Sequence, residues 1–332
     1  MDLTLGLLIT VVVVALAFDF VNGFHDAANA IATVVVSRTL TPFQAILMAG
    51  LANFVGYFFF GVTVAKTIGK DVVQLSQMTL PVILAALTGA VTWNLITWIL
   101  GLPTSSSHAL IGGIVGAALV AAGPSVLIWD GLLKILGFIV LAPVLGFLGA
   151  SLITVLIFWI FRRAHPHRVQ PLFKGLQLLA AAYFSVTHGA NDSQKTMAVI
   201  AMALVAAGVH TTLTLDPWVI FSCYLAISLG TMFGGWRIVK TMGTSITKIR
   251  AMEGFASNLA AGTVLAVTAT AGIPVSTTHV ISGSIMGVGA VENAAAVKWI
   301  TARRIVWAWI ITIPAAAGIA ALVCLGLRLL PA

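Results

Sequence analysis

The chain has 332 residues, of which 60% are hydrophobic and only 8% are charged, and its formal net charge is +8. A soluble domain carries about a quarter charged residues, so this composition excludes a soluble protein and indicates one that lives in a lipid bilayer. The positive charge does not indicate nucleic-acid binding, because basic residues of membrane proteins gather in cytoplasmic loops.

Apolar runs of about 20 residues, the length that crosses a bilayer as a helix, recur along the whole chain. They lie at about 3–20, 43–65, 80–100, 131–161, 176–187, 217–236, 253–271 and 305–330. Since lipid offers no hydrogen-bond partner to backbone groups, these runs predict an all-α polytopic membrane protein. No basic residue precedes the first run, so we expect a retained membrane helix there and not a signal peptide.

Three blocks of sequence occur twice in the same order, which indicates an internal duplication. The pairs are GFHDAAN (23–29) with GANDSQK (189–195), KTIG (66–69) with KTMG (240–243), and GLPTSSSH (101–108) with GIPVSTTH (272–279). We therefore expect a first repeat at 1–161 with a hairpin tip at 103–108, a basic cytoplasmic linker at 162–174, and a second repeat at 175–332 with a hairpin tip at 274–279.

The segment 80–122 is broken at Pro103, and we interpret it and its second copy as two re-entrant hairpins. Each half then crosses the membrane an odd number of times, which turns the second copy upside down, as in the inverted repeats of secondary transporters. With FRRAHPHR (161–168) in the cytoplasm, twelve Lys and Arg lie inside and four outside, and both termini lie outside. This topology fails if 80–100 spans the membrane, for which it is long enough.

Asp26 and Asp192 are ionisable groups in apolar surroundings, where each costs at least about 2.5–3.5 kcal/mol on insertion scales. Small and polar residues interrupt the apolar segment at each of them, namely Asn22 and Gly23 in one copy and Gly189 and Asn191 in the other. We expect broken helices here, whose free amides attract anions and whose carbonyls and carboxylates suit a cation or a proton.

The hairpin tips carry consecutive hydroxyl groups beside a proline that starts a helix, so hydroxyls and helix N-terminal amides can converge on an oxyanion. Inverted symmetry would bring both tips to one central site near the midplane. The expected anion ligands are Thr104, Ser105, Ser106, Ser107, Ser276, Thr277 and Thr278.

Plainer interpretations stay open at these positions. Hydroxyl residues in membrane helices often bond back to their own backbone. Lys195 could extend to an interface instead of facing the site. His108 and His279 could serve helix packing or carry protons, whereas His25 and His188 lie nearer the carboxylates.

At these clusters the chain resembles the inorganic phosphate transporter (PiT) family, whose hallmark is a duplicated G-A-N-D-x-A-N-A signature in inverted halves. The copies read GFHDAANA (23–30) and GANDSQKT (189–196), and the resemblance covers nearly the whole chain. It implies a homodimeric secondary transporter of inorganic phosphate. It also implies that Asp26, Asn29, Asn191 and Asp192 are ion- and phosphate-site residues.

Two departures from the signature concern the coupling ion. His25 stands where Asn191 stands in the second copy, and Lys195 replaces the asparagine matched by Asn29. An ammonium cannot bind sodium, so Lys195 cannot supply the oxygen ligand that sodium-coupled relatives keep at this position. The stretches NGFHD and ND-x-QK resemble the bacterial proton-coupled branch of the family, for whose relatives uptake of phosphate with a divalent metal is also reported. Lys195 would supply a fixed positive charge or bind the anion directly. With Asn191, Gln194 and Lys195 added to the substrate ligands, the expected coupling residues are Asp26, Asp192, Asn29, Asn22 and His25.

We therefore expect a symporter of inorganic phosphate in the bacterial inner membrane that works by alternating access and is driven by protons. Sodium coupling, and sulfate or metal phosphate as substrate, are alternatives on the same architecture. An anion channel is a rival, although an occluded site between inverted halves fits a carrier better. We expect no enzyme, no resident metal and no cofactor, because the chain has no H-E-x-x-H or nucleotide motif.

Overall fold

The structure is a computed structural model that describes residues 3–244 and 246–329. Throughout these residues the chain is helical, and its extended pairing is limited to a single bridge between Val73 and Leu127. The α-helices are α1 (Leu3–Val36), α2 (Pro42–Phe59), α3 (Thr63–Asp71), α4 (Leu80–Ile99), α5 (Ser106–Ala122), α6 (Trp129–Phe161), α7 (Pro166–Ala206), α8 (Pro217–Phe233), α9 (Trp236–Thr244), α10 (Ala251–Thr270), α11 (Thr277–Asn293) and α12 (Trp299–Arg328). The prediction of an all-α polytopic membrane protein is confirmed.

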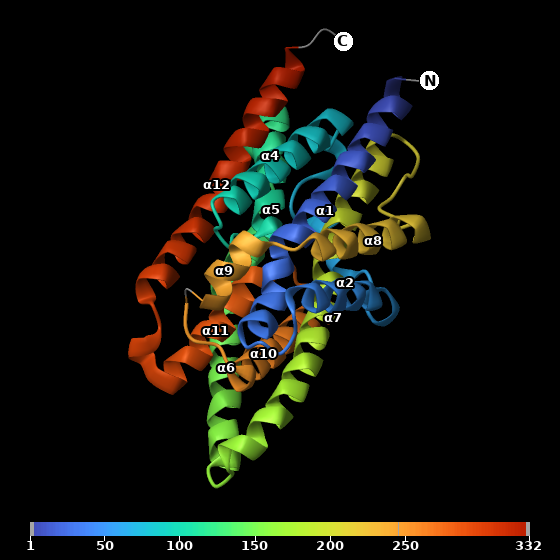
Figure 1. Cartoon of the computed structure of the whole chain (residues 1–332). Coiled ribbons are helices and arrows are strands. Elements are labelled where there is room, and N and C mark those ends of the chain that lie inside the picture. The colour runs from blue at the N-terminus through green and yellow to red at the C-terminus, as the bar shows by residue number, and fades with distance from the viewer. Residues whose placement is uncertain (1–2, 245, 330–332) are drawn as a thin grey trace.

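The second six α-helices repeat the order of the first six. The short helices α3 and α9 have 9 residues each, α4 and α10 have 20 each, and α5 and α11 have 17 each. Figure 1 shows that α1 and α7 run in opposite directions, as do α6 and α12. Two inverted repeats would produce this arrangement, and their boundaries stay a prediction. Of the expected linker, only 162–165 connects α6 with α7, since 166–174 is already helical.

The prediction of helix breaks beside Asp26 and Asp192 is wrong. Helices α1 and α7 are continuous through these positions, and the glycines have another role. A Cβ on Gly23 would lie 2.2 Å from the Ile227 carbonyl oxygen in α8, and one on Gly189 would lie 2.4 Å from the Asn53 carbonyl oxygen in α2. Glycine therefore allows close helix contact here, at a cost in helix propensity of about 1 kcal/mol that does not interrupt the helix.

The helices are interrupted at other places. Helices α8 and α9 meet at Gly234 with a bend of 73°, and Gly234 has a φ of 73° that favours glycine. The turns of the two hairpins, α4–α5 and α10–α11, contain Gly101 and Gly272, with φ of 66° and 69°. These turns precede the prolines of the predicted tips, so the tip positions agree with the sequence.

Each hairpin packs on a long helix of the opposite half. Helix α5 lies on α12, where a Cβ on Gly116 would come within 2.1 Å of the Ala317 carbonyl oxygen. Helix α11 lies on α6, where a Cβ on Gly287 would come within 2.3 Å of the Phe147 carbonyl oxygen. Each tip is followed by a Gly-x-x-x-Gly step, Gly112 with Gly116 and Gly283 with Gly287. These steps are packing seams, because the glycines allow close contact with α12 and α6.

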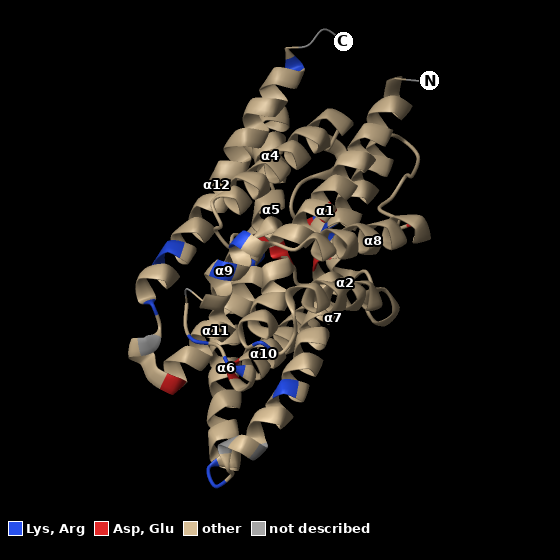
Figure 2. Ribbon diagram, viewed as in Figure 1, with Lys and Arg blue, Asp and Glu red and all other residues tan. Residues whose placement is uncertain are grey.

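Within the described residues, five helices are long and apolar enough to cross a membrane, namely α1, α2, α4, α6 and α12, and the bent pair α8–α9 makes a sixth candidate. Because α4 is itself long and apolar enough to cross a membrane, its assignment as a limb of a re-entrant hairpin stays a prediction. Figure 1 places both termini at one end of the molecule, and Figure 2 shows Lys and Arg around α9, the start of α12 and the α6–α7 connection, toward the other end. The chain is a multi-pass membrane protein.

Candidate functional site

The two hairpin tips meet in the interior, between α1 and α7. His108 and His279 follow the tips directly, and their ring centroids lie 4.5 Å apart. Every site residue expected from the sequence is buried, with at most 5% of its surface exposed. The expected residues of both halves therefore lie in the buried interior around the two tips.

Lys195 connects α7 with both tips. Its Nζ forms an ion pair with Asp192, donates to the hydroxyl of Ser107 in the first tip, and donates to the carbonyl of Val275 in the second tip at 3.0 Å. Only 2% of its side chain is exposed. The alternative in which Lys195 extends to an interface is therefore wrong.

Asn29 makes the corresponding contact from α1. Its Nδ2 donates to Thr278 Oγ1 at 2.9 Å. Asn29 and Lys195 occupy equivalent places in the two signatures, and Ser107 and Thr278 occupy equivalent places in the two tips. Each signature residue thus bonds to the tip of the opposite half.

Asp192 is compensated by several groups. Besides Lys195, Thr277 Oγ1 donates to Asp192 Oδ2 at 3.2 Å, and His188 Nε2 lies 3.3 Å from the same oxygen. All of these side chains are at most 2% exposed. A buried carboxylate needs such partners to stay ionised, so the charge on Asp192 depends on its neighbours.

Asp26 has different surroundings. Its Oδ1 lies 2.7 Å from His25 Nδ1, and His25 Nε2 lies 3.1 Å from Thr97 Oγ1. Thr104 Oγ1 donates to Thr97 Oγ1 at 2.9 Å. Thr104, expected as an anion ligand, is therefore part of a hydrogen-bond network that ends at Asp26.

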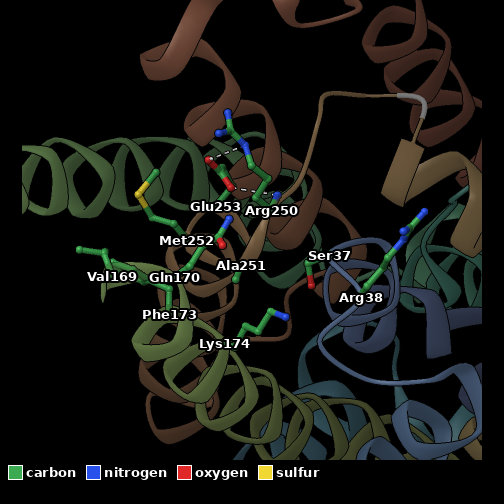
Figure 3. Close-up of a pocket in the computed structure, with 10 residues that line it drawn as sticks. All are labelled: Ser37, Arg38, Val169, Gln170, Phe173, Lys174, Arg250, Ala251, Met252 and Glu253. Carbon is green, nitrogen blue, oxygen red and sulfur yellow. Dashed lines mark hydrogen bonds and ion pairs between the residues drawn. The ribbon is translucent and has the colours of Figure 1, made fainter. Parts of the chain in front are cut away.

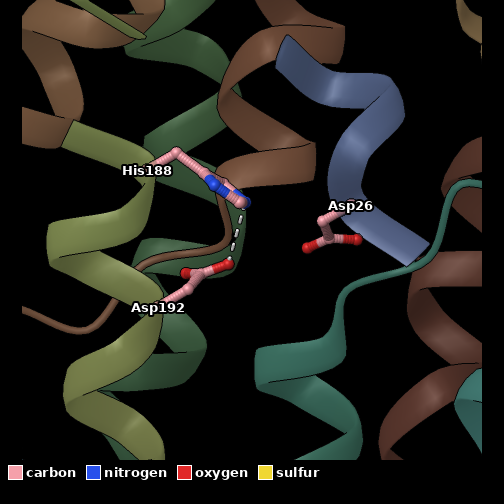
Figure 4. A group of neighbouring side chains, drawn as sticks. All are labelled: Asp26, His188 and Asp192. Atoms are coloured by element: carbon pink, nitrogen blue, oxygen red, sulfur yellow. Dashed lines mark ion pairs between the residues drawn. The ribbon is translucent and has the colours of Figure 1, made fainter. Parts of the chain in front are cut away.

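Figure 4 shows that Asp26 on α1 faces His188 and Asp192 on α7. One ligand atom from each of the three side chains lies within 4.8 Å of the others. Two carboxylates and an imidazole at this separation can share a proton or hold a cation, because either charge offsets the repulsion between the carboxylates.

The serines before the helices cap them. Ser105 and Ser276 each accept a hydrogen bond from a backbone amide of the first turn, both at 3.2 Å, and thereby cap α5 and α11. The N-termini of α5 and α11 therefore both lie at the site. Ser106 Oγ and both amide atoms of Asn191 are buried without a hydrogen-bond partner in the described part of the chain, as is Asn22 Oδ1.

Gln194 lies beside the site but faces α3. Its Oε1 accepts hydrogen bonds from the amides of Val64 and Ala65 at 2.8 and 3.3 Å, and its Nε2 donates to the Ala190 carbonyl at 2.8 Å. The residue before α3 provides no side-chain cap. Gln194 therefore caps α3 from outside, because its side chain accepts the hydrogen bonds of the first free amides. We had grouped Gln194 with the anion ligands because the sequence does not show which helix lies next to its side chain.

Two polar residues near the site were not singled out in the sequence. Thr97 links His25 with Thr104, and Asp19 is a fully buried carboxyl on α1. Asp19 precedes Asp26 by seven residues, which places both on one face of a helix. That spacing was the signal available for Asp19.

A cavity of about 400 Å³ lies where the end of α1 meets the starts of α7 and α10. Its polar lining includes Ser37, Arg38, Lys174, Arg250 and Glu253. Figure 3 shows the Arg250–Glu253 ion pair on one side of the cavity and Lys174 on the opposite side. This cavity therefore opens near the basic end of the molecule.

Gln177 lies between this cavity and the central site. Its Nε2 donates to the Thr33 carbonyl at 3.0 Å, and its Oε1 accepts from Ser37 at 2.9 Å. Asn258 Nδ2 donates to Thr33 Oγ1 at 2.9 Å. Since Thr33 follows Asn29 by one helical turn, these contacts between α1, α7 and α10 lie between the site and the cavity.

The chain matches the sequence profile of the Phosphate transporter family over residues 22–320. It is 49% identical to the "Probable low-affinity inorganic phosphate transporter" of Rhizobium meliloti (strain 1021), with 97% of each chain covered. It is 46% identical to the protein of the same name in Bacillus subtilis (strain 168), again with 97% of each covered. Among solved structures it is similar to one titled "The sodium-dependent phosphate transporter", with a TM-score of 0.91, 26% identity, and 98% of this chain and 100% of the other covered.

Proposed function

Because the chain belongs to the phosphate transporter family, we propose that it imports inorganic phosphate together with protons across the bacterial inner membrane by alternating access. The observation that carries this proposal is the meeting of two helix N-termini and one buried ammonium, that of Lys195, beside two carboxylates. Such a site offers positive charge and hydrogen-bond donors to an anion and basic oxygens to a proton.

The anion would be held by donors from both halves. The first-turn amides of α5 and α11 have no intrahelical acceptors, and each helix N-terminus carries about half a positive charge. Ser106 and Ser107 from one tip and Thr277 and Thr278 from the other supply hydroxyls beside these amides. Lys195 already contacts Ser107, so its ammonium lies within reach of an oxyanion bound at the tips.

The position of Lys195 supports protons as the coupling ion. An ammonium there supplies a fixed positive charge where the family signature has an amide oxygen, which favours protons over a second sodium ion. Asp26 and Asp192 are the proposed proton acceptors. Their carboxylates would also accept a hydrogen bond from the proton of hydrogen phosphate, and sulfate has no such proton to donate. Sodium coupling is the alternative, and the structural similarity to a sodium-dependent transporter favours it.

Alternating access would release the contacts that now close the site. We propose that phosphate leaves through the basic cavity when Gln177 separates from Thr33 and Ser37, with the basic end in the cytoplasm and both termini outside. The α4–α5 and α10–α11 hairpins would carry the ligands, and the long helices α6 and α12 would support them. A homodimer is expected from the family resemblance.

Uptake of labelled phosphate into proteoliposomes tests the proposal, with pH and sodium gradients imposed separately. We expect phosphate accumulation that an acidic exterior drives, that a protonophore abolishes, and that excess sulfate does not inhibit. Flux without coupling to any gradient would indicate a channel. Accumulation driven by sodium alone would favour the alternative.

Lys195→Asn provides the second arm of this test, because it restores the amide of the family signature. We expect this variant to gain a dependence on sodium. If Lys195→Asn and Asp192→Asn both left proton-driven uptake intact, the assigned site would be wrong.

A further inference from the structure

Asp19 is a buried carboxyl that the proposed phosphate site does not use. It lies on α1, is 0% exposed, and neither of its oxygens makes a hydrogen bond of standard geometry within the described residues. Asn22 follows it by three residues and Asp26 by seven, so all three share one face of α1 over about 10 Å. A carboxyl two turns away from Asp26, on the same helix face, calls for a role of its own.

The surroundings of Asp19 are polar but provide no free cation. The groups facing it are Asn22 on α1, Asp192, Lys195 and Thr196 on α7, and Cys223 and Tyr224 on α8. The charge of Lys195 is already taken by Asp192, and its remaining hydrogen bonds go to the two tips. The hydroxyls of Thr196 and Tyr224 are also buried without a hydrogen-bond partner in the described residues. Thr196 and Asn22 are the neighbours placed to hydrogen-bond with the carboxyl of Asp19, and no cation pairs with Asp19 alone.

An unpaired carboxylate in such a place is unfavourable in its charged form. Transfer of an isolated carboxylate from water to a medium of low dielectric costs so much that the group takes up a proton instead. Burial without a cation of its own therefore favours the neutral form of Asp19.

We propose that Asp19 is a separate proton-carrying site of the transport cycle, which rests on the proposed proton-coupled import of phosphate. It takes up a proton when water reaches it from the acidic side, keeps that proton while the site is closed, and releases it when the opposite side opens. Because Asn22 stands between Asp19 and Asp26, the proton on Asp19 is bound beside the phosphate site and not on the phosphate ligands themselves. Proton and phosphate can then be bound at the same time.

The test compares Asp19→Asn, which mimics the protonated carboxyl, with Asp130→Asn, which removes a carboxyl from an exposed position. A gradient of one pH unit raises the accumulation ratio about tenfold for each coupled proton. We therefore expect Asp19→Asn to lower pH-driven phosphate accumulation about tenfold per imposed pH unit, while phosphate exchange without a gradient continues. Asp130→Asn should behave as the unmodified protein, and Asp19→Glu should restore part of the accumulation.

Infrared spectroscopy of the purified protein provides a readout that does not depend on transport. A carbonyl-stretch band of a protonated carboxylic acid should be present and should be lost in Asp19→Asn. If the band is unchanged, or if Asp19→Asn concentrates phosphate as well as the unmodified protein, the assignment of Asp19 is overturned. Accumulation that sodium drives and that Asp19→Asn abolishes would also overturn it, in favour of a sodium ion.

The two proposals can fail separately. If the unmodified protein neither exchanges nor concentrates phosphate, the proposed function fails, whatever the infrared band shows. If it concentrates phosphate under a pH gradient and Asp19→Asn does so equally well, only the proton site at Asp19 fails.

Discussion

Lys195→Met would test the central ion pair directly. The substitution keeps much of the side-chain volume and removes the ammonium from Asp192, which is 0% exposed. Removal of one partner from a buried ion pair costs about 3–5 kcal/mol, because the other charge stays buried. Thr277 and His188 still face Asp192, so we expect the lower end of this range. A loss of about 3 kcal/mol lowers the folding equilibrium constant more than about a hundredfold.

A double-mutant cycle in detergent, measured by denaturant titration, gives the coupling between the two charges. The variants are Lys195→Met, Asp192→Asn and the two combined. The double variant should be within about 1 kcal/mol of the unmodified protein, because a buried ion pair can often be replaced by neutral groups at little cost. Lys134→Met, at an exposed lysine, is the matched control and should change stability by less than about 0.5 kcal/mol. A loss below about 1 kcal/mol for Lys195→Met, or additive effects in the cycle, would refute the reasoning.

Two further predictions concern packing and capping. Gly116→Ala places a methyl 2.1 Å from a carbonyl oxygen of α12 and should lower the stability by about 1–3 kcal/mol, whereas Gly318→Ala, with nothing within 4 Å, should be neutral or raise it by up to about 1 kcal/mol. Thermal unfolding compares the two variants, and equal shifts of their unfolding temperatures would contradict the packing seam at Gly116. Gln194→Ala removes the acceptor of two α3 amides, so hydrogen exchange should become faster at the start of α3, by an amount that matches a lost cap of about 0.5–2 kcal/mol. Unchanged exchange there would show that Gln194 does not cap α3.

Features that depend on local sequence were predictable. The low content of charge and the length of the apolar runs predict membrane helices, and the duplicated blocks predict the repeated order of elements. A proline and consecutive hydroxyls marked each tip before a helix, and the expected inverted symmetry of the two copies predicted that the tips meet. These signals need no knowledge of tertiary neighbours.

Features that depend on a neighbour in space were not predictable. Gly23 looks the same in sequence whether it breaks a helix or admits another helix, and only the contact with α8 decides between them. Gln194 lies within a polar signature, yet its hydrogen bonds go to α3. The bond from Asn29 to Thr278 crosses between the halves, so no local pattern indicates it.

The glycine seams also have a consequence for biosynthesis. The α4–α5 hairpin is made early, but the surface on which it lies belongs to α12, which is made long after it. Until α12 has been inserted, Gly116 and its neighbours have no partner surface, and the first half cannot reach its final packing. The first tip therefore reaches its final place only after α12 has been made.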